Sequence, residues 1–224
     1  MQNRGKFIVI DGLDGSGKGT IAGMLYDYLA SSGKKVRRVS FPAYGHDSAK
    51  LVEMYLSGAF GKRPDDTNAY AASVFFAVDR YVQYVTDLRE YLSDENAILI
   101  SDRYTSANAV HQLSKLKKEE WDSFLSWLFD FEYNKMGIAA PDTVVYLEMK
   151  PEISRALISK RHDETGRTVD IHEKDREYLD RCYEAAMYAC DKMGWQRVCN
   201  YEGDALRDLN AVLAEVIEKT GLDK

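Results

Sequence analysis

Gly12–Thr20 (GLDGSGKGT) is the stretch that decides the fold of this 224-residue chain. It follows a short apolar run, Phe7–Ile10, and it precedes apolar residues at helical spacing, among them Ile21 and Leu25. A strand, a glycine-rich turn and a helix in this order predict a phosphate-binding loop, because the turn and the helix dipole direct backbone N–H groups at one anion. Lys18 would reach the β- and γ-phosphates of a nucleotide and face solvent in the empty site. The alternative is a glycine turn that stands before a helix by chance.

Composition and charge narrow the class of protein. The net charge of −6 argues against a general binder of nucleic acid or of anionic membranes, so a bound phosphate needs a local cluster of cations. No apolar run approaches membrane-spanning length, and residues 1–5 lead directly into the first apolar run, so we expect no signal or transit peptide. Cys182, Cys190 and Cys199 form no C-x-x-C pair and are interpreted as buried free thiols in a reducing cytoplasm.

Apolar runs predict five strands, at residues 6–11, 35–40, 97–101, 142–147 and 195–200. Helical patterns alternate with these runs and are clearest at 68–92, 121–136 and 178–193. Such alternation predicts a parallel sheet with helices on both faces. We therefore expect an α/β fold with three layers. The length allows one large domain or two small ones, and we expect a single domain over residues 1–224.

A charged segment at about 160–170 separates two helical patterns, and we predict that it is a mobile lid. The alternative is an ordinary solvated loop. Asp170 and Glu173 follow it with the spacing of an acidic N-cap and its partner glutamate, and capping is an equally good explanation of them. The charged run Lys115–Glu120 is interpreted as the solvated start of a helix.

Asp102 and Arg103 follow directly after strand 97–101. Ligands of doubly wound sheets bind at the carboxyl ends of the strands, so both side chains should emerge beside the phosphate loop. Arg103 can hold a phosphate with two hydrogen bonds, and Asp102 can hold a Mg²⁺-bound water or orient an arginine. The alternative is a structural ion pair at a strand end.

Aromatic residues near these motifs indicate a base pocket. Phe76 and Arg80 are four residues apart and share a helix face, where a ring could stack on a nucleobase and the guanidinium could donate to a carbonyl oxygen. Phe41 and Tyr44 follow the second strand and could wall the same pocket. Taken alone, an aromatic at this helical spacing is more often a core residue, and Arg80 could simply pair with groups around Asp79. Phe41–Tyr44 alone is only a turn.

Together these segments resemble the thymidylate kinase family of nucleoside monophosphate kinases, in the family's order and over nearly the whole chain. The resemblance rests on DGLDGSGKGT at 11–20, Phe41-Pro42, FAVDR at 76–80, Asp102-Arg103-Tyr104 with Asn108, Pro141-Asp142, Pro151-Glu152 and Asp170-Ile171-His172-Glu173. It implies a three-layer α/β/α phosphate-loop kinase fold with a five-stranded parallel sheet and a lid. It also implies a cytoplasmic homodimer, which the broad apolar face of helix 68–92 permits.

The resemblance implies roles for individual residues. Phe76 stacks on thymine, Arg80 donates a hydrogen bond to the base, and Asn108 also faces it. Arg103 binds the acceptor phosphate, and Asp14 meets the sugar 3′-hydroxyl or the magnesium shell. The remaining substrate contacts are Phe41, Tyr44, His111, Asp170 and Glu173.

On the donor side, the resemblance assigns ATP to the whole loop. Its members are Gly12, Leu13, Asp14, Gly15, Ser16, Gly17, Lys18, Gly19 and Thr20. Since the loop carries Gly15 and no arginine there, the extra catalytic arginine belongs in the lid, where Arg161 and Arg167 are the candidates. Gly19 occupies the usual Ser/Thr position, so Thr20, with Asp102 through a water, is our candidate for Mg²⁺.

The implied reaction is ATP plus dTMP giving ADP plus dTDP. The catalytic groups would be Lys18, Arg103, Arg161, Arg167 and Asp102. The acceptor is a phosphate oxygen that is largely ionised at neutral pH, because its second pKa is about 6, and it needs no general base. A deoxynucleoside kinase is the nearest alternative, although the turn after the second strand lacks the glutamate expected there and only Asp102 could serve. A nucleotide-dependent switch without turnover is another.

Two positions depart from the family pattern. Ala43 stands where many relatives have an arginine, and Lys50 or Lys62 could supply the missing phosphate contact. His111 stands where relatives usually have a tyrosine near the sugar 2′ carbon, so selectivity against ribonucleotides is open.

Overall fold

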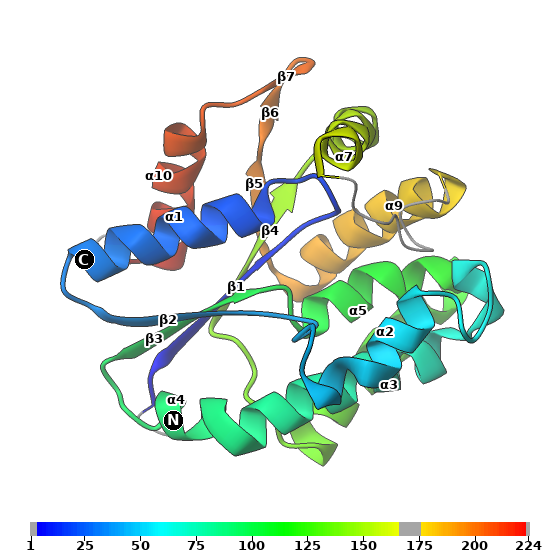
Figure 1. The fold of residues 1–224 in the computed structure, drawn as a ribbon, viewed down its shortest axis with the longest axis horizontal. Helices are drawn as coiled ribbons and strands as arrows, with labels where there is room; N and C mark the ends of the chain where they lie inside the picture. Colours follow the sequence, from blue (N-terminus) through cyan, green and yellow to red (C-terminus); the bar gives the residue numbers. More distant parts are fainter. Residues whose placement is uncertain (1–3, 166–175, 223–224) are drawn as a thin grey trace.

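Five parallel strands form the central sheet, in the order β2-β3-β1-β4-β5 (Figure 1). The computed structural model describes residues 4–165 and 176–222. The strands are β1 (Lys6–Asp11), β2 (Lys35–Ser40), β3 (Ala97–Asp102), β4 (Thr143–Glu148) and β5 (Gln196–Cys199). The predicted α/β fold with a five-stranded parallel sheet is therefore confirmed, with two strands at the predicted bounds and the ends of the other three displaced by at most one residue.

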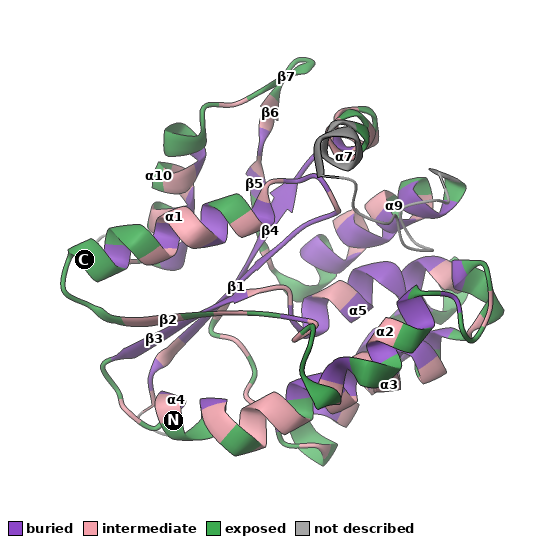
Figure 2. Ribbon diagram, in the orientation of Figure 1, coloured by how far each residue is buried: buried purple, intermediate pink, exposed green. Residues whose placement is uncertain are grey.

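Alternate residues of β1 belong to two different cores. Ile8 and Ile10 pack in one cluster with α1 (Lys18–Ser31) and α10 (Leu209–Thr220), whereas Phe7 and Val9 pack in a second cluster on the other face. Side chains of a strand point alternately to the two faces of a sheet, so a strand covered on both faces is apolar throughout. Figure 2 shows the resulting buried centre and the more exposed edge strand β2.

Most of the other helices lie on the second face, where Arg89–Leu92 is beside the start of β1 and Thr105–His111 follows the carboxyl end of β3 (Figure 1). The bounds of the helices after α1 are α2 (Lys50–Leu56), α3 (Ala69–Gln83), α4 (Arg89–Leu92), α5 (Thr105–His111), α6 (Trp121–Phe129), α7 (Pro151–Thr165) and α9 (Arg176–Met193). A short hairpin of β6 (Tyr201–Glu202) and β7 (Ala205–Leu206) precedes α10. None of the described helices combines the length and the apolar character needed to cross a bilayer.

Two of the predicted helices contain a π-helical turn that the sequence did not predict. The pattern at 68–92 comprises α3, a π-helix at Tyr84–Leu88, and α4. The pattern at 121–136 comprises α6 and a π-helix at Asp130–Lys135. π-Helical turns are uncommon in proteins, and those that do occur often lie at functional sites.

The segment that we expected to be a lid lies largely outside the described residues. Residues 160–165 continue α7, and residues 166–175 are not described, so the lid stays a prediction. The three cysteines are free, as predicted, and Cys182 and Cys190 are buried, but Cys199 is only half-buried.

Our interpretation of Lys115 as part of a solvated run is wrong. Its ammonium group donates to the Tyr55 hydroxyl (2.8 Å) and to the Thr67 carbonyl oxygen (3.1 Å). Burial lowers its pKa to about 8. Lys118 and its two acidic neighbours are exposed, so the solvated surface begins after Lys115.

The cap of α10 provides a test of the fold at a distance from the phosphate loop. The Asp208 carboxylate accepts hydrogen bonds from the backbone N–H groups of Asn210 and Ala211, both at 3.0 Å. We expect Asp208→Ala to lower the free energy of unfolding by about 1 kcal/mol in urea denaturation, because two N–H groups of the first turn lose their acceptor.

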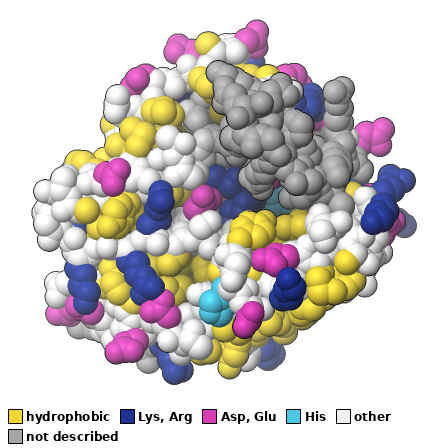
Figure 3. Space-filling model, viewed as in Figure 1, with side chains coloured by type: hydrophobic (Ala, Val, Ile, Leu, Met, Phe, Trp, Pro, Cys, Tyr) yellow, Lys and Arg dark blue, Asp and Glu magenta, His cyan; other side chains and the backbone are white. Residues whose placement is uncertain are grey.

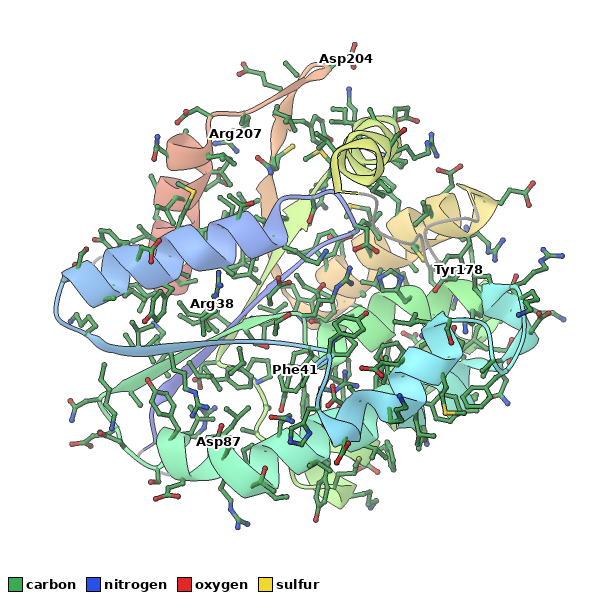
Figure 4. All side chains as sticks on the ribbon, viewed as in Figure 1. Arg38, Phe41, Asp87, Tyr178, Asp204 and Arg207 are labelled. Carbon is green, nitrogen blue, oxygen red and sulfur yellow. The ribbon has the colours of Figure 1, made fainter. Side chains whose placement is uncertain are left out.

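Asp204→Ala is the control, since the Asp204 side chain is 98% exposed in the β6–β7 hairpin and forms only a surface ion pair with Lys150 (Figure 4). It should leave the free energy of unfolding within about 0.5 kcal/mol of wild type. Equal effects of the two substitutions would contradict the capping role.

Candidate active site

The phosphate loop is held in a conformation that only glycine adopts readily. Gly12, Gly15 and Gly17 have φ angles of 156°, 79° and 84°. A Cβ on Gly12 would lie 2.6 Å from Ser16 Oγ, and one on Gly15 would lie 2.8 Å from the Ser154 carbonyl oxygen. Side chains are therefore excluded for lack of space as well as by backbone conformation.

Two residues that the sequence analysis missed hold the loop from outside. Ser154 on α7 donates from its hydroxyl to the Asp14 carbonyl oxygen. Asn200, directly after β5, donates from Nδ2 to the Ser16 carbonyl oxygen at 2.7 Å. Both belong to segments far along the chain, so only the folded arrangement identifies them.

Lys18 does not face solvent, which corrects our expectation. Its side chain is 11% exposed, and Nζ lies 3.3 Å from Asp14 Oδ1 and 3.4 Å from the Leu13 carbonyl oxygen. Burial lowers its pKa, and the positive charge of Arg103 lowers it further. A triphosphate that enters the loop would meet an ammonium group already turned back onto the loop.

Arg103 lies at the end of β3, where the strand register places it beside the phosphate loop. Ile10 of β1 pairs with Asp102, and the Arg103 backbone N–H donates to the Ile10 carbonyl oxygen at 3.0 Å. The φ angle of Arg103 is 67°, an unusual conformation for a residue with a side chain. Strained backbone of this kind is common at functional sites, where surrounding contacts maintain it.

The Arg103 guanidinium is held on two sides. Nη2 donates to Asp14 Oδ1 at 2.5 Å, and Nη1 lies 3.1 Å from His111 Nε2. Burial alone would raise the pKa of Asp14, but the charges of Arg103 and Lys18 outweigh it and hold that pKa well below its usual range. Asp14 therefore stays charged and joins the two cations of the site.

His111 is a neutral acceptor in this arrangement. Burial and the charge of Arg103 lower its pKa to about 3, so Nε2 keeps its lone pair and accepts from Arg103. Nδ1 lies 3.6 Å from Cys182 Sγ, and the ring stacks on Tyr178 of α9 with centroids 6.2 Å apart. Tyr178 lies at the start of α9, facing α5 (Figure 4).

A cavity of about 390 Å³ contains most of the predicted site. Beside loop residues it is lined by Phe41, Tyr44, Phe76, Arg80, Asp102, Arg103, Asn108 and His111. Figure 3 shows basic side chains together in the middle of this face of the molecule. Phe41 lies directly after β2 (Figure 4), and its ring is buried against that of Tyr104, with ring centroids 5.6 Å apart. Tyr44, in contrast, is 57% exposed.

Arg80 is buried and paired with an acid that the sequence analysis did not assign. Nε and Nη2 donate to the two Glu132 oxygens at 2.7 and 2.6 Å, and Nη1 donates to the Tyr104 carbonyl oxygen at 3.3 Å. Glu132 also accepts from Thr105 Oγ1 (2.8 Å) and Asn108 Nδ2 (3.3 Å). Its position among the apolar residues of the 121–136 pattern was the signal that could have identified it.

Gln112 is a second residue that the sequence analysis missed. It lines the cavity and is fully buried, and neither Nε2 nor Oε1 has a hydrogen-bond partner within residues 4–165 and 176–222. Buried amides without a partner are costly, so this side chain fits a site completed by a ligand.

Magnesium can be tested against the residues that the sequence assigned to it. Oδ1 of Asp102 is buried without a partner among the described residues, and such a carboxylate oxygen suits a Mg²⁺-bound water. A Cβ on Gly19 would lie 3.0 Å from Asp102 Oδ2, so a side chain at this position would be tight against that carboxylate. Thr20 is exposed and lines the cavity, so the donor set fits the ion.

Several predicted residues are not brought together by the described structure. Arg161 lies in α7, but its side chain is not described, and Arg167, Asp170 and Glu173 lie outside the described residues. Lys50 pairs with Glu53 at 3.5 Å. Neither Lys50 nor Lys62 lines the cavity in the described part of the chain, so a phosphate contact from either one stays a prediction.

Comparison with known proteins points to one family. A sequence model described as thymidylate kinase matches residues 10–198. A thymidylate kinase of Mycobacterium tuberculosis is 29% identical over 191 residues, which cover 84% of this chain and 86% of that protein. A thymidylate kinase of Schizosaccharomyces pombe is 27% identical over 175 residues, which cover 77% of this chain and 74% of that protein. The solved thymidylate kinase of Candida albicans matches the fold with a TM-score of 0.72 at 21% identity, covering 98% of this chain and 92% of that one.

The buried His111 predicts a loss of stability in mild acid. Its pKa is lowered from 6.5 to about 3, so between these values the unfolded chain binds one proton more than the folded chain. This contribution to stability is complete above about pH 6.5 and falls by about 1.4 kcal/mol per pH unit as the pH falls. We expect the free energy of unfolding, measured by urea denaturation, to fall between about pH 6.5 and pH 4.5 by about 2 kcal/mol more in the wild type than in His111→Gln.

The matched control is His46→Gln, since His46 is exposed. Its stability should follow the wild-type dependence on pH. Parallel curves for wild type and His111→Gln would show that His111 takes up its proton as readily in the folded chain as in the unfolded one.

Proposed function

Since this chain belongs to the thymidylate kinase family, we propose that it transfers the γ-phosphoryl group of ATP to dTMP, giving ADP and dTDP. The observation that carries this proposal is the Asp14 carboxylate, which holds Lys18 of the phosphate loop and Arg103 of the β3 end in one cavity. Two cations so placed suit two phosphate groups that must approach each other.

Charge neutralisation and positioning supply the catalysis in this proposal. The loop N–H groups and Lys18 bind the β- and γ-phosphates, and Arg103 binds the acceptor phosphate, so the repulsion between the substrates is offset. Because the acceptor oxygen is already ionised, no general base is required. This distinguishes the reaction from phosphorylation of a nucleoside hydroxyl, which profits from a positioned carboxylate.

Magnesium belongs to the proposed holoenzyme. Asp102, through water, and Thr20 would hold it, and the ion would neutralise part of the phosphate charge. The remaining acceptor contacts are assigned to Tyr44 at the mouth of the cavity and to Phe76, whose ring is half-buried in its wall.

We extend the proposal to the lid, the assembly and the compartment. Arg161 and Arg167 are proposed to close over the phosphates, and Asp170 and Glu173 to contact the sugar or the metal. A cytoplasmic homodimer is proposed from the family resemblance, and the exposed Tyr70 and Tyr81 on α3 support a contact between copies.

The reaction is tested by measuring ADP formation with dTMP, with thymidine or with no acceptor. We expect ADP only with dTMP, in proportion to dTDP. Turnover with thymidine but not with dTMP would assign the protein to the deoxynucleoside kinases. Equal ATP loss without an acceptor would indicate a hydrolase or a nucleotide switch.

Lys18→Met tests the donor site without opening a cavity. The substitution removes the charge and keeps the apolar stem, while Asp14 remains paired with Arg103, so the fold should survive. We expect kcat to fall by about 10²–10³-fold, with a melting temperature close to that of wild type. The control is Lys34→Met, an exposed position that should keep kcat. A Lys18→Met enzyme with wild-type kcat would remove this lysine from the site.

A further inference from the structure

We propose that Glu132 determines which pyrimidine monophosphate the enzyme accepts, by fixing the hydrogen-bond donors and acceptors that Arg80 and Asn108 present to the base. The inference rests on the proposed function, because it concerns the base of the acceptor nucleotide. Glu132 itself lies behind these two residues, on the π-helical turn Asp130–Lys135. It is a positioning residue, and it acts through Arg80 and Asn108.

The first observation is the number of hydrogen bonds that converge on one buried carboxylate. The Glu132 side chain is fully buried and accepts four hydrogen bonds, two from Arg80 and one each from Thr105 and Asn108. Burial alone would lower the pKa of Arg80, but the charge of Glu132 raises it above its ordinary value, so Arg80 stays charged. Four donors leave the carboxylate little freedom to rotate.

The second observation is what these bonds leave available to a ligand. Both hydrogens of Asn108 Nδ2 are engaged, one by Glu132 and one by the Ser73 carbonyl oxygen (3.1 Å). The amide is therefore oriented so that only its Oδ1 acceptor remains for a ligand. Arg80 can only donate, and its Nη1 and Nη2 groups each retain one hydrogen. Both residues line the cavity.

A donor beside an acceptor selects between pyrimidines. A 4-oxo pyrimidine with an N3–H group presents an acceptor and a donor, which are complementary to Arg80 and to Asn108 Oδ1. A 4-amino pyrimidine presents the opposite pair, so donor would face donor and acceptor would face acceptor. A donor or acceptor that is buried without a partner loses its hydration and gains no hydrogen bond in return. A site of this kind therefore discriminates strongly between the two classes of pyrimidine.

Glu132→Gln tests the inference with little change of shape. The glutamine amide would offer one acceptor and one donor where the carboxylate offered two acceptors. Asn108 Nδ2 would then be held by the Ser73 carbonyl oxygen alone, so the amide could rotate more easily. A rotated amide would donate from Nδ2 to the N3 lone pair of a 4-amino pyrimidine and lose its acceptor for the N3–H group of a 4-oxo pyrimidine, while Arg80 would remain a donor. We expect the ratio of kcat/KM for dTMP to that for dCMP to fall about tenfold or more, with KM for ATP unchanged.

Asp130→Asn is the matched control, because it makes the same chemical change on the same turn at an exposed side chain. It should leave the dTMP to dCMP ratio at the wild-type value. A purely structural role of Glu132 would lower kcat/KM for both monophosphates together and leave their ratio intact. That result, in a folded Glu132→Gln enzyme, would overturn the inference.

Thr105→Val covers the case in which Glu132→Gln does not fold. It removes one of the four hydrogen bonds and keeps the charge pair, so the ratio should fall by a smaller factor, about threefold. An unchanged ratio in this variant would also overturn the inference. A wild-type protein that phosphorylates neither monophosphate would refute the proposed function instead. The inference would then be tested by calorimetry, as the ratio of the affinities for dTMP and dCMP in wild type and variants.

Discussion

The ion pairs of Asp14 with Arg103 and Lys18 are the interaction on which the site depends. Asp14 belongs to the phosphate loop after β1, and Arg103 belongs to the turn after β3, and strand register places these two ends side by side. A carboxylate in so enclosed a position is tolerable only with cations beside it, and here it has two. One acid therefore fixes the spacing of the two positive groups that are proposed to bind the donor and acceptor phosphates.

The second buried ion pair organises the other part of the cavity by the same principle. Arg80 on α3 and Glu132 on the π-helical turn after α6 come from separate elements, and their ion pair joins these two. Thr105 and Asn108 donate to the same carboxylate and add α5. Each arginine of the cavity is thus oriented by its own acid before any ligand binds. Preorganised charges of this kind avoid the cost of reorientation during the reaction.

Local patterns predicted the fold and the motifs, whereas contacts distant in sequence were not predictable. The five strands and the phosphate loop follow from apolar runs and glycines that act over a few residues. The burial of Lys18 depends on Asp14 and the closure of the loop around it, and spacing alone gave no sign of it. Glu132 has its role through hydrogen-bond partners that only the fold brings to it. Gln112 is identified by the opposite observation, since its buried amide has no hydrogen-bond partner among the described residues. A polar residue within an apolar helical face was the only local sign of Glu132.

The most direct test of this account is a crystal structure of the protein with dTMP. We predict that the phosphate lies on the Arg103 guanidinium and that the thymine ring lies against Phe76 within the cavity that both residues line. The nucleotide bound elsewhere, or bound in the cavity with its phosphate away from Arg103, would contradict the account.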